Sequence, residues 1–363
     1  MSERGATFAM IAMLAVGFCV WVVPAAVGQV TITEYSAGIT AGSLPLGITA
    51  GPDGALWFAE QGGPRIGRIT TAGVVTEYSA GITAGSNPVG ITVGSDGALW
   101  FTEQGADRIG RITTGGTVTE YSVGITAGSV PYWIAAGSDG ALWFTEYNGN
   151  RIGRITTAGV VTEYSTGITA GAGPLGIAAG PDGALWFTEY PGNRIGRITT
   201  AGVVTEYSAG IAAGGGPFEI AVGPDGALWF TEYNGNRIGR ITTAGVVTEY
   251  STGITAGAGL SGITAGLDSA VWFTETGGNR IGRITTAGMV TEYSAGITPG
   301  AGPFEIVTGA DGALWFTEYN ASRIGRVSGP GLQVSAIPAL SGFGALLMAV
   351  LVVGLSVFLL RRS

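Results

Sequence analysis

The 363-residue chain contains no lysine, no histidine and a single cysteine, Cys19. Histidine is the side chain that most often transfers protons near neutral pH, so acid–base chemistry here would need a perturbed glutamate, such as Glu219 or Glu305. One cysteine cannot form an internal disulfide or a cysteine-ligated metal site. These absences narrow the possible chemistry to carboxylates, hydroxyls, amides and aromatic rings.

Basic side chains are few and repetitive. All seventeen are arginine, and fourteen belong to the repeated string Arg-Ile-Gly-Arg, from Arg65 and Arg68 to Arg323 and Arg326. The net charge is −8, and glutamates flank most of these arginines. The chain therefore offers no basic surface to neutralise phosphates, which argues against nucleic acid as a partner.

Helical patterns are also absent. No internal segment combines a long apolar period of 3.6 residues with capping residues, and the 66 glycines would be costly inside helices. Short strand-like segments separated by turn residues predict an all-β fold.

One unit of 43 residues repeats seven times without insertion or deletion, and its tryptophans mark it at Trp57, Trp100, Trp143, Trp186, Trp229, Trp272 and Trp315. That length is typical of one four-stranded propeller blade. In the fourth copy the expected strands are 175–179, 184–189, 194–199 and 203–208. We predict a seven-bladed β-propeller over residues 29–328, as a monomer.

The ends of the repeat predict how the ring closes. The string Thr-Glu-Tyr first occurs at Thr33, before any other segment of a unit, and the last unit ends near Arg326 without one. A strand over residues 31–36 that completes the seventh blade would remove both free sheet edges. An open solenoid would instead need distinct polar caps.

Two flanking segments predict export. Residues 1–28 have the basic start, apolar run and small residues of a cleaved signal peptide. Residues 343–363 consist of an apolar span and a basic tail with Arg361 and Arg362. We expect a transmembrane helix with its basic tail inside and the propeller outside the cytoplasm, in the periplasm, outer envelope or at the cell surface. Residues 329–342 would be a linker.

The end of the linker resembles a known type of C-terminal sorting signal. The string that begins at Ile337 and Pro338, followed by the apolar span and two arginines, is similar to the IPTL type of C-terminal tail of Gram-negative bacteria. It departs from that type at Ala339 and at Gly342-Phe343. The tail would either be clipped after export or anchor the protein permanently.

Repeated charges predict structural pairs first. An arginine such as Arg197 can face Glu206 across a hairpin, a contact worth roughly 0.2–1 kcal/mol. The glutamate that ends the second segment of each unit allows two readings: it pairs with a neighbour such as Arg194, or a ring of such carboxylates binds Mg²⁺ or Ca²⁺. The metal candidates are Glu146, Glu189, Glu232 and Glu318.

Variation among the copies predicts the ligand face. The connections that precede the first segment and follow the second differ between units, whereas the other turns barely change. Aromatic residues and two extra carboxylates concentrate there, typical of a patch for sugars, peptides or a macrocycle; alternatively they only cover the blade ends. The candidates are Tyr132, Trp133, Tyr147, Tyr190, Phe218, Glu219, Tyr233, Phe304, Glu305 and Tyr319.

The strings Leu-Trp-Phe-Thr-Glu, Arg-Ile-Gly-Arg-Ile-Thr and Val-Thr-Glu-Tyr resemble the virginiamycin B lyase (streptogramin lyase) family over all seven units. The resemblance implies a seven-bladed propeller and magnesium-assisted opening of a cyclic depsipeptide by histidines. The matching positions here are Leu46, Val89, Tyr132, Leu175, Phe218, Ser261 and Phe304. The family's acidic residue two positions before a histidine is also missing, and only the glutamate after Trp-Phe-Thr is retained.

Two functions follow from these observations. The first is an exported binding or scaffold module for a polysaccharide, peptide or protein. The second is a metal-dependent lyase or hydrolase. The missing histidines, the absence of an inserted lid and the near-perfect symmetry favour the binding module.

Overall fold

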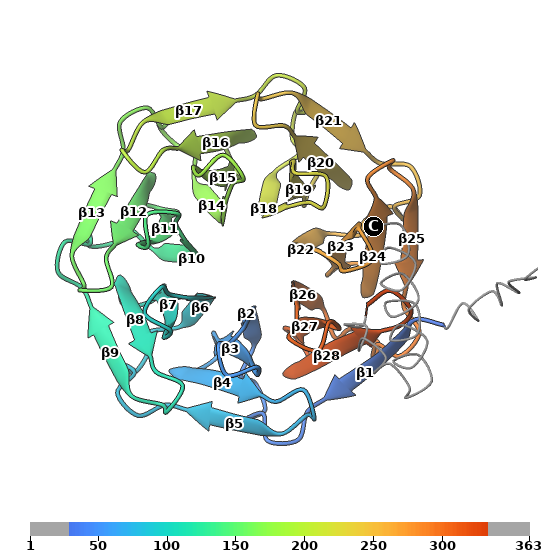
Figure 1. Ribbon diagram of the computed structural model, residues 1–363, viewed down its shortest axis with the longest axis horizontal. Helices are drawn as coiled ribbons and strands as arrows, with labels where there is room; N and C mark the ends of the chain where they lie inside the picture. Colours follow the sequence, from blue (N-terminus) through green and yellow to red (C-terminus); the bar gives the residue numbers. More distant parts are fainter. Residues whose placement is uncertain (1–28, 333–363) are drawn as a thin grey trace, which may run out of the picture.

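The computed structural model describes residues 29–332, which form seven four-stranded antiparallel sheets arranged around a central channel (Figure 1). This architecture confirms the predicted seven-bladed propeller. The expected signal peptide, most of the linker and the expected transmembrane segment lie outside the described residues. Within residues 29–332 no helix is long and apolar enough to cross a membrane.

The innermost strand of each blade lines the channel and begins with proline in six of seven cases (Figure 1). These strands are β2 (Pro45–Ala50), β6 (Pro88–Val93), β10 (Pro131–Ala136), β14 (Pro174–Ala179), β18 (Pro217–Val222), β22 (Leu260–Ala265) and β26 (Pro303–Thr308).

The second strand is apolar and buried on both faces, because adjacent blades pack against it. These strands are β3 (Leu56–Glu60), β7 (Leu99–Glu103), β11 (Leu142–Glu146), β15 (Leu185–Glu189), β19 (Leu228–Glu232), β23 (Ala270–Glu275) and β27 (Leu314–Glu318). The third strand carries the paired arginines: β4 (Arg65–Ile69), β8 (Arg108–Ile112), β12 (Arg151–Ile155), β16 (Arg194–Ile198), β20 (Arg237–Ile241), β24 (Arg280–Thr285) and β28 (Arg323–Ser328).

The outermost strands carry the string Thr-Glu-Tyr and are partly exposed. They are β5 (Val75–Tyr78), β9 (Val118–Tyr121), β13 (Val161–Tyr164), β17 (Val204–Tyr207), β21 (Val247–Tyr250), β25 (Val290–Tyr293) and, for the seventh blade, β1 (Thr31–Tyr35). β1 pairs with β28 from Thr31–Ser328 to Tyr35–Ile324, so the first strand closes the ring as predicted.

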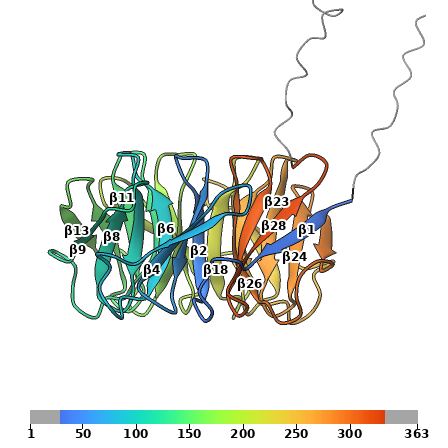
Figure 2. The ribbon, with the colours of Figure 1, turned by 90° about the horizontal axis from the view of Figure 1, so that it is seen from below.

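Strands run between two loop faces, as the side view shows (Figure 2). The site face, as we call it, carries the connections that follow the second and the outermost strands. The turn face carries the short turns that follow the innermost and third strands. The antiparallel order of every sheet places these two sets of connections at opposite ends.

Each blade is held by the same stack around its tryptophan. In the fourth blade Trp186 stacks on Tyr207, with ring centroids 5.5 Å apart, and the Arg197 guanidinium lies 5.9 Å from its centroid. The indole N–H donates to Asp182 Oδ1 at 3.0 Å, while Arg197 Nε donates to Asp182 Oδ2 at 2.7 Å. One turn aspartate thus fixes both the aromatic ring and the cation beside it.

The predicted pair of Arg197 with Glu206 is wrong. Arg197 lies opposite Thr205 in the hairpin, and Glu206 lies opposite Gly196. Because successive side chains in a strand point to opposite faces, Glu206 lies on the other face of the blade from Arg197. Arg197 binds the turn aspartate instead, and Glu206 binds Thr169 in the loop that enters the blade.

Candidate functional site

A β-bulge at the start of every innermost strand shapes the site-face end of the channel. In the third blade Pro131 pairs with Glu146 and Ile134 pairs with Phe144, which leaves one extra residue on the inner strand. The same slip occurs in all seven blades. Bulges re-aim side chains, and the two residues inside these bulges are those that vary between copies.

The second bulge residue is glycine in four blades and a large side chain in three. The glycines are Gly47, Gly90, Gly176 and Gly262, and the large side chains are Trp133, Glu219 and Glu305. A Cβ on Gly47 or Gly90 would lie 3.0 Å from the Trp133 ring, and one on Gly176 would lie 3.1 Å from Glu219 Oε1. The glycines therefore leave the space that the three large side chains occupy.

Aromatic rings converge at the site-face end of the channel. Phe218 contacts three of them, with centroid distances of 6.0 Å to Tyr190, 5.5 Å to Tyr233 and 5.8 Å to Phe304. The last contact joins two blades that are not adjacent in the ring, so it crosses the channel. Edge-on and tilted packing of this kind is the favourable arrangement for aromatic pairs.

Further rings extend this cluster on both sides. Tyr319 packs 5.9 Å from Phe304, and Tyr147 packs 6.5 Å from Tyr132. Burial, followed by the nearby Tyr319 and Glu219, raises the pKa of Tyr132 to about 12. We call the seven residues the aromatic collar: Tyr132, Tyr147, Tyr190, Phe218, Tyr233, Phe304 and Tyr319.

Amides and hydroxyls link the collar into a partial belt. Tyr319 donates its hydroxyl to Gln61 at 2.9 Å, and Gln61 donates its amide to Gln104 at 3.0 Å. On the other side Asn234 donates to the Tyr190 hydroxyl at 3.0 Å. A cavity of about 310 Å³ opens beside the belt, with walls formed by Gln104, Tyr132, Tyr147, Leu175, Tyr190 and Phe218.

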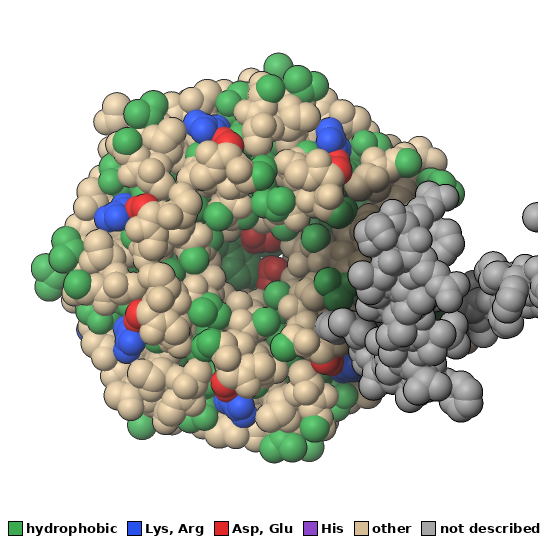
Figure 3. All heavy atoms as spheres, in the orientation of Figure 1, with side chains coloured by type: hydrophobic (Ala, Val, Ile, Leu, Met, Phe, Trp, Pro, Cys, Tyr) green, Lys and Arg blue, Asp and Glu red, His purple; other side chains and the backbone are tan. Residues whose placement is uncertain are grey.

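The two extra carboxylates belong to the innermost strands and interact across the channel. Glu219 is 7 % exposed, and its Oε1 accepts the backbone N–H of Ile220 at 3.3 Å. Glu305 is half-buried, and the Oε2 atoms of both residues are buried without a hydrogen-bond partner. Figure 3 shows acidic side chains inside the central hollow, with hydrophobic side chains around them.

Burial raises the pKa of both carboxyls. Burial first, and then repulsion from Glu305, raises the pKa of Glu219 well above its usual range. Burial raises the pKa of Glu305 to about 8. Neither carboxylate forms a salt bridge within the described chain, so no internal cation offsets their charge.

Threonines of the second strands fix the backbone that presents these side chains. Thr145 accepts the N–H of Trp133 at 3.0 Å and donates to the carbonyl of Leu175, in the next blade, at 2.7 Å. Equivalent threonines accept the N–H of Glu219 at 3.1 Å and of Glu305 at 3.0 Å. We call each of these threonine hydroxyls, which joins two blades through two hydrogen bonds, a threonine clasp. The strands that carry the collar residues are therefore held rigidly at the site-face end of the channel.

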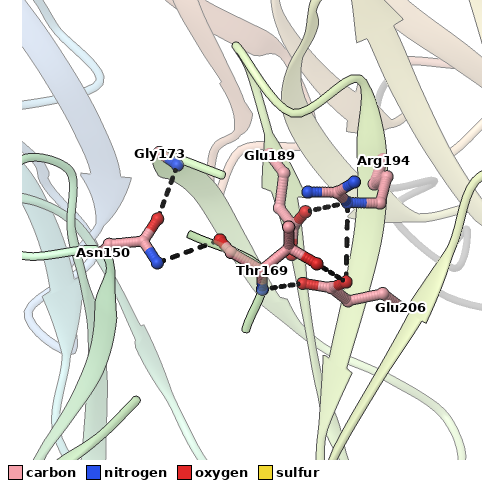
Figure 4. Close-up of polar contacts among 6 residues, drawn as sticks. All are labelled: Asn150, Thr169, Gly173, Glu189, Arg194 and Glu206. Carbon is pink, nitrogen blue, oxygen red and sulfur yellow. Dashed lines mark hydrogen bonds and ion pairs between the residues drawn. The ribbon is translucent and has the colours of Figure 1, made fainter. Parts of the chain in front are cut away.

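The glutamates predicted as metal ligands lie elsewhere, one inside each blade. Glu189 is fully buried and accepts Arg194 Nε at 2.8 Å, and Arg194 also lies 3.5 Å from Glu206 (Figure 4). Glu206 binds the Thr169 backbone N–H and hydroxyl, both at 2.6 Å. From the preceding blade Asn150 donates to the Thr169 carbonyl at 3.0 Å (Figure 4). We call this arrangement of glutamate, arginine, glutamate and threonine the brace.

The brace varies among blades. Glu232 pairs with Arg237 as Glu189 pairs with Arg194, whereas the carboxylates of Glu146 and Glu318 are buried without hydrogen-bond partners. Burial raises the pKa of Glu189 and Glu232 to about 7 and that of Glu146 and Glu318 to about 8. The predicted pairing of this glutamate with arginine is therefore confirmed for Glu189 and Glu232.

A metal-binding ring does not fit this arrangement. The structure does not bring Glu146, Glu189, Glu232 and Glu318 together, because each is enclosed in its own blade. Among residues 29–332 no three His, Cys, Asp or Glu side chains lie close enough together to bind a metal ion. Hard cations need more oxygen ligands than one enclosed carboxylate supplies.

The ten predicted ligand residues do lie close to one another, at the channel and its site-face end, although their role in binding stays a prediction. The list of predicted ligand residues omitted Gln61, Gln104 and Leu175, which belong to the same surface. The two glutamines could have been predicted as part of this surface, because the same position is tyrosine in four other copies.

A family model and two solved structures at 40% identity indicate the same family. The virginiamycin B lyase family matches residues 22–212 and 210–341 of the chain. The structure of a streptogramin B lyase is 40% identical, with a TM-score of 0.77 over 82% of this chain and 97% of that one. Virginiamycin B lyase from Staphylococcus aureus is 40% identical, with a TM-score of 0.77 over 83% of this chain and 99% of that one.

More distant structures share the fold alone. The extracellular domain of a putative one-component system from B. thetaiotaomicron is 16% identical, with a TM-score of 0.65 over 84% of this chain and 42% of that one. A comparison with curated protein sequences found no match.

Proposed function

The chain belongs to the virginiamycin B lyase family, and within this family we propose that it acts as a ligand-binding module whose site is the aromatic collar. The observation that carries the proposal is the convergence of seven rings and a 310 Å³ cavity at one end of the channel. Aromatic walls with a few polar groups are typical of small-ligand sites.

Three collar residues support binding in preference to catalysis. Tyr132, Phe218 and Phe304 occupy positions that match the histidines of the family, and no other matching position carries a group that transfers protons near neutral pH. An apolar ring there enlarges the contact surface and removes the acid–base group. The ligand classes that suit such a surface are a polysaccharide, a peptide or a segment of a protein.

The experiment is a glycan and peptide array probed with the full chain, followed by titration of each hit. A Phe218→Ala variant removes the ring at the centre of the collar, so binding should weaken about tenfold or more. Val203→Ala changes an exposed side chain on the turn face and serves as the matched control. Equal affinities of the two variants for every hit would overturn the assignment of the collar as the site.

A lyase is the second candidate, and one observation favours it. The glutamate after Trp-Phe-Thr is retained, and burial raises the pKa of Glu232 to about 7, a value suited to acid–base work. Against it, Glu232 is fully buried and bound to Arg237 at 2.8 Å. Incubation with a cyclic depsipeptide lactone and Mg²⁺ decides: ring opening that Glu232→Gln abolishes would establish the lyase.

We also propose that the propeller is exported and held at the cell envelope. The support is the sequence of residues 1–28 and 343–363, with its apolar spans and terminal arginines. Protease added to intact cells that express the full chain, with and without outer-membrane permeabilisation, tests this. Protection from protease after permeabilisation of the outer membrane would place the propeller in the cytoplasm and contradict the proposal.

A further inference from the structure

The central channel contains a second feature that the collar alone does not require. Glu219 and Glu305 are the acidic residues of the seven innermost strands, and both have a buried oxygen without a partner. Every other buried glutamate in the described chain sits in a blade, next to the arginine of its brace or of an equivalent position. These two carboxylates have no such arginine neighbour, and the charge of Glu305 acts on Glu219.

Buried carboxylates without partners are costly, so their surroundings are informative. A charged carboxylate in an apolar site must be protonated, paired or bound to a cation. Protonation satisfies the charge but leaves the lone pairs of Glu219 Oε2 and Glu305 Oε2 without a donor. A bound donor with positive charge would satisfy both requirements at once.

The walls of the channel favour an organic cation. Phe218 and Phe304 immediately precede the two glutamates, and their rings contact each other at 5.8 Å across the channel. The face of an aromatic ring attracts ammonium and guanidinium groups by roughly 0.5–2 kcal/mol. A metal ion would find only two carboxylates here, and no third Asp, Glu, His or Cys joins them among residues 29–332.

We propose that the channel binds the ammonium or guanidinium group of a basic ligand between Glu219 and Glu305, beneath Phe218 and Phe304. Two glycines let the strands that carry the glutamates pack closely in the channel: a Cβ on Gly176 would lie 3.1 Å from Glu219 Oε1, and one on Gly262 would lie 2.7 Å from Glu305 Cα. This inference rests on the proposed binding function and names the chemical class that the site selects.

A basic group can come from two sources, a free amine or a lysine side chain of a peptide. Calorimetric titration of the full chain with butylammonium tests the first source. The peptide Ala-Ala-Lys-Ala-Ala, with blocked ends, tests the second, and the same peptide with acetylated lysine is its neutral match. We expect at least one basic probe to bind about tenfold more tightly than the neutral peptide.

Two variants locate the binding. Glu219→Gln combined with Glu305→Gln keeps the size of both side chains and removes their charge, so binding of the basic probes should fall about tenfold or more. Glu163→Gln alters an outer-strand carboxylate of similar type and is the control. Because binding displaces a proton, the measured heat should also change with the ionisation enthalpy of the buffer for the wild type but not for the double variant.

The outcomes separate this inference from the proposed function. Array ligands that bind through Phe218 without any preference for basic groups would leave the binding module standing and overturn the cation site. Basic probes that bind equally to wild type and double variant would also overturn it. Basic probes that bind when no array ligand does would support the cation site and contradict the broader ligand classes. Thermal melts of the double variant at pH 8 check that it folds.

Discussion

Arg323 donates a hydrogen bond to Glu34 at 2.8 Å, although 289 residues separate the two in the chain. In the second blade the same contact joins Arg108 and Glu120 at 2.7 Å, only 12 residues apart. The ring is thus closed by the brace that holds the other blades, formed this time between the two ends of the propeller. Backbone pairing and side-chain contacts agree on which strand completes the seventh blade.

This closure makes the first strand as important as any internal one. Glu34→Gln removes charge-assisted hydrogen bonds to Thr298 and Arg323, which should cost about 1–3 kcal/mol of unfolding free energy. Urea denaturation measures the loss, and Glu163→Gln, which breaks the equivalent brace inside the third blade, should lose a similar amount. A change below about 0.5 kcal/mol for Glu34→Gln alone would show that the ring does not depend on this brace.

The glycine in the middle of each third strand is required by a phenylalanine. A Cβ on Gly196 would lie 2.1 Å from Phe187 Cζ, so Gly196→Ala must displace a fully buried ring. We expect a loss of about 2–3 kcal/mol in thermal or urea unfolding. Gly171→Ala meets nothing within 4 Å and has a φ of +75°, so only backbone strain of about 1 kcal/mol should follow. Equal losses would contradict this account.

One blade lacks the threonine clasp. Ala59 occupies the position of Thr145, so the N–H of Gly47 and the carbonyl of Val89 are not joined by a hydroxyl as their equivalents are. Ala59→Thr should add the clasp and stabilise the fold by about 0.5–1.5 kcal/mol. Thr145→Ala is the reverse test and should cost about 1–3 kcal/mol. A destabilised Ala59→Thr protein would mean that the first two blades pack too closely for it.

Enclosed glutamates should make the stability depend on pH. Burial, followed by the charge of Glu120, raises the pKa of Glu103 to about 8, and neither of its carboxylate oxygens has a hydrogen-bond partner. Between the unfolded value near 4.5 and about 8, the folded chain keeps a proton that the unfolded chain releases. Stability therefore falls as pH rises through this window.

The matched variant isolates this contribution. Glu103→Gln cannot ionise, so its unfolding free energy should fall less than that of the wild type between pH 5 and pH 8. Glu120 acts in the opposite direction: burial alone would raise its pKa, but hydrogen bonds from Thr83 and the charge of Arg108 lower it. Its contribution is present above its unfolded pKa and is lost as pH falls, which limits the gain at acid pH. Parallel pH curves for variant and wild type would refute the role of Glu103.

The repeat period and the order of the strands could be predicted because every copy of the unit shows the same pattern. The 43-residue spacing, the tight turns and the displaced Thr-Glu-Tyr string at Thr33 together specify seven blades and their closure. Strand register could not be predicted in the same way. A difference of one residue decides whether Arg197 faces Glu206 or Asp182, and both partners are acidic.

The residues of the candidate site could be predicted from the sequence, but the burial of the glutamates near it could not. Differences between copies pointed to Phe218, Glu219 and their equivalents, since structural demands alone would keep the copies alike. The burial of Glu146 and Glu189 was not visible, because a strand-end glutamate has the same sequence whether it reaches solvent or a neighbouring arginine. Their different partners also became evident only from the packing, since Glu189 binds Arg194 and Glu146 has no hydrogen-bond partner.

The repeated brace has a consequence for how such rings change in size. β1 supplies the same carboxylate to the seventh blade as an internal outermost strand supplies to its own blade. The contacts of the brace are therefore the same whichever units are neighbours in the ring. Duplication or loss of a whole unit would leave each remaining joint chemically intact. Contacts at the axis differ in this respect, because Trp133 reaches Gly47 two units away and no other unit has a tryptophan at that position, so this contact would be lost if the units between them changed.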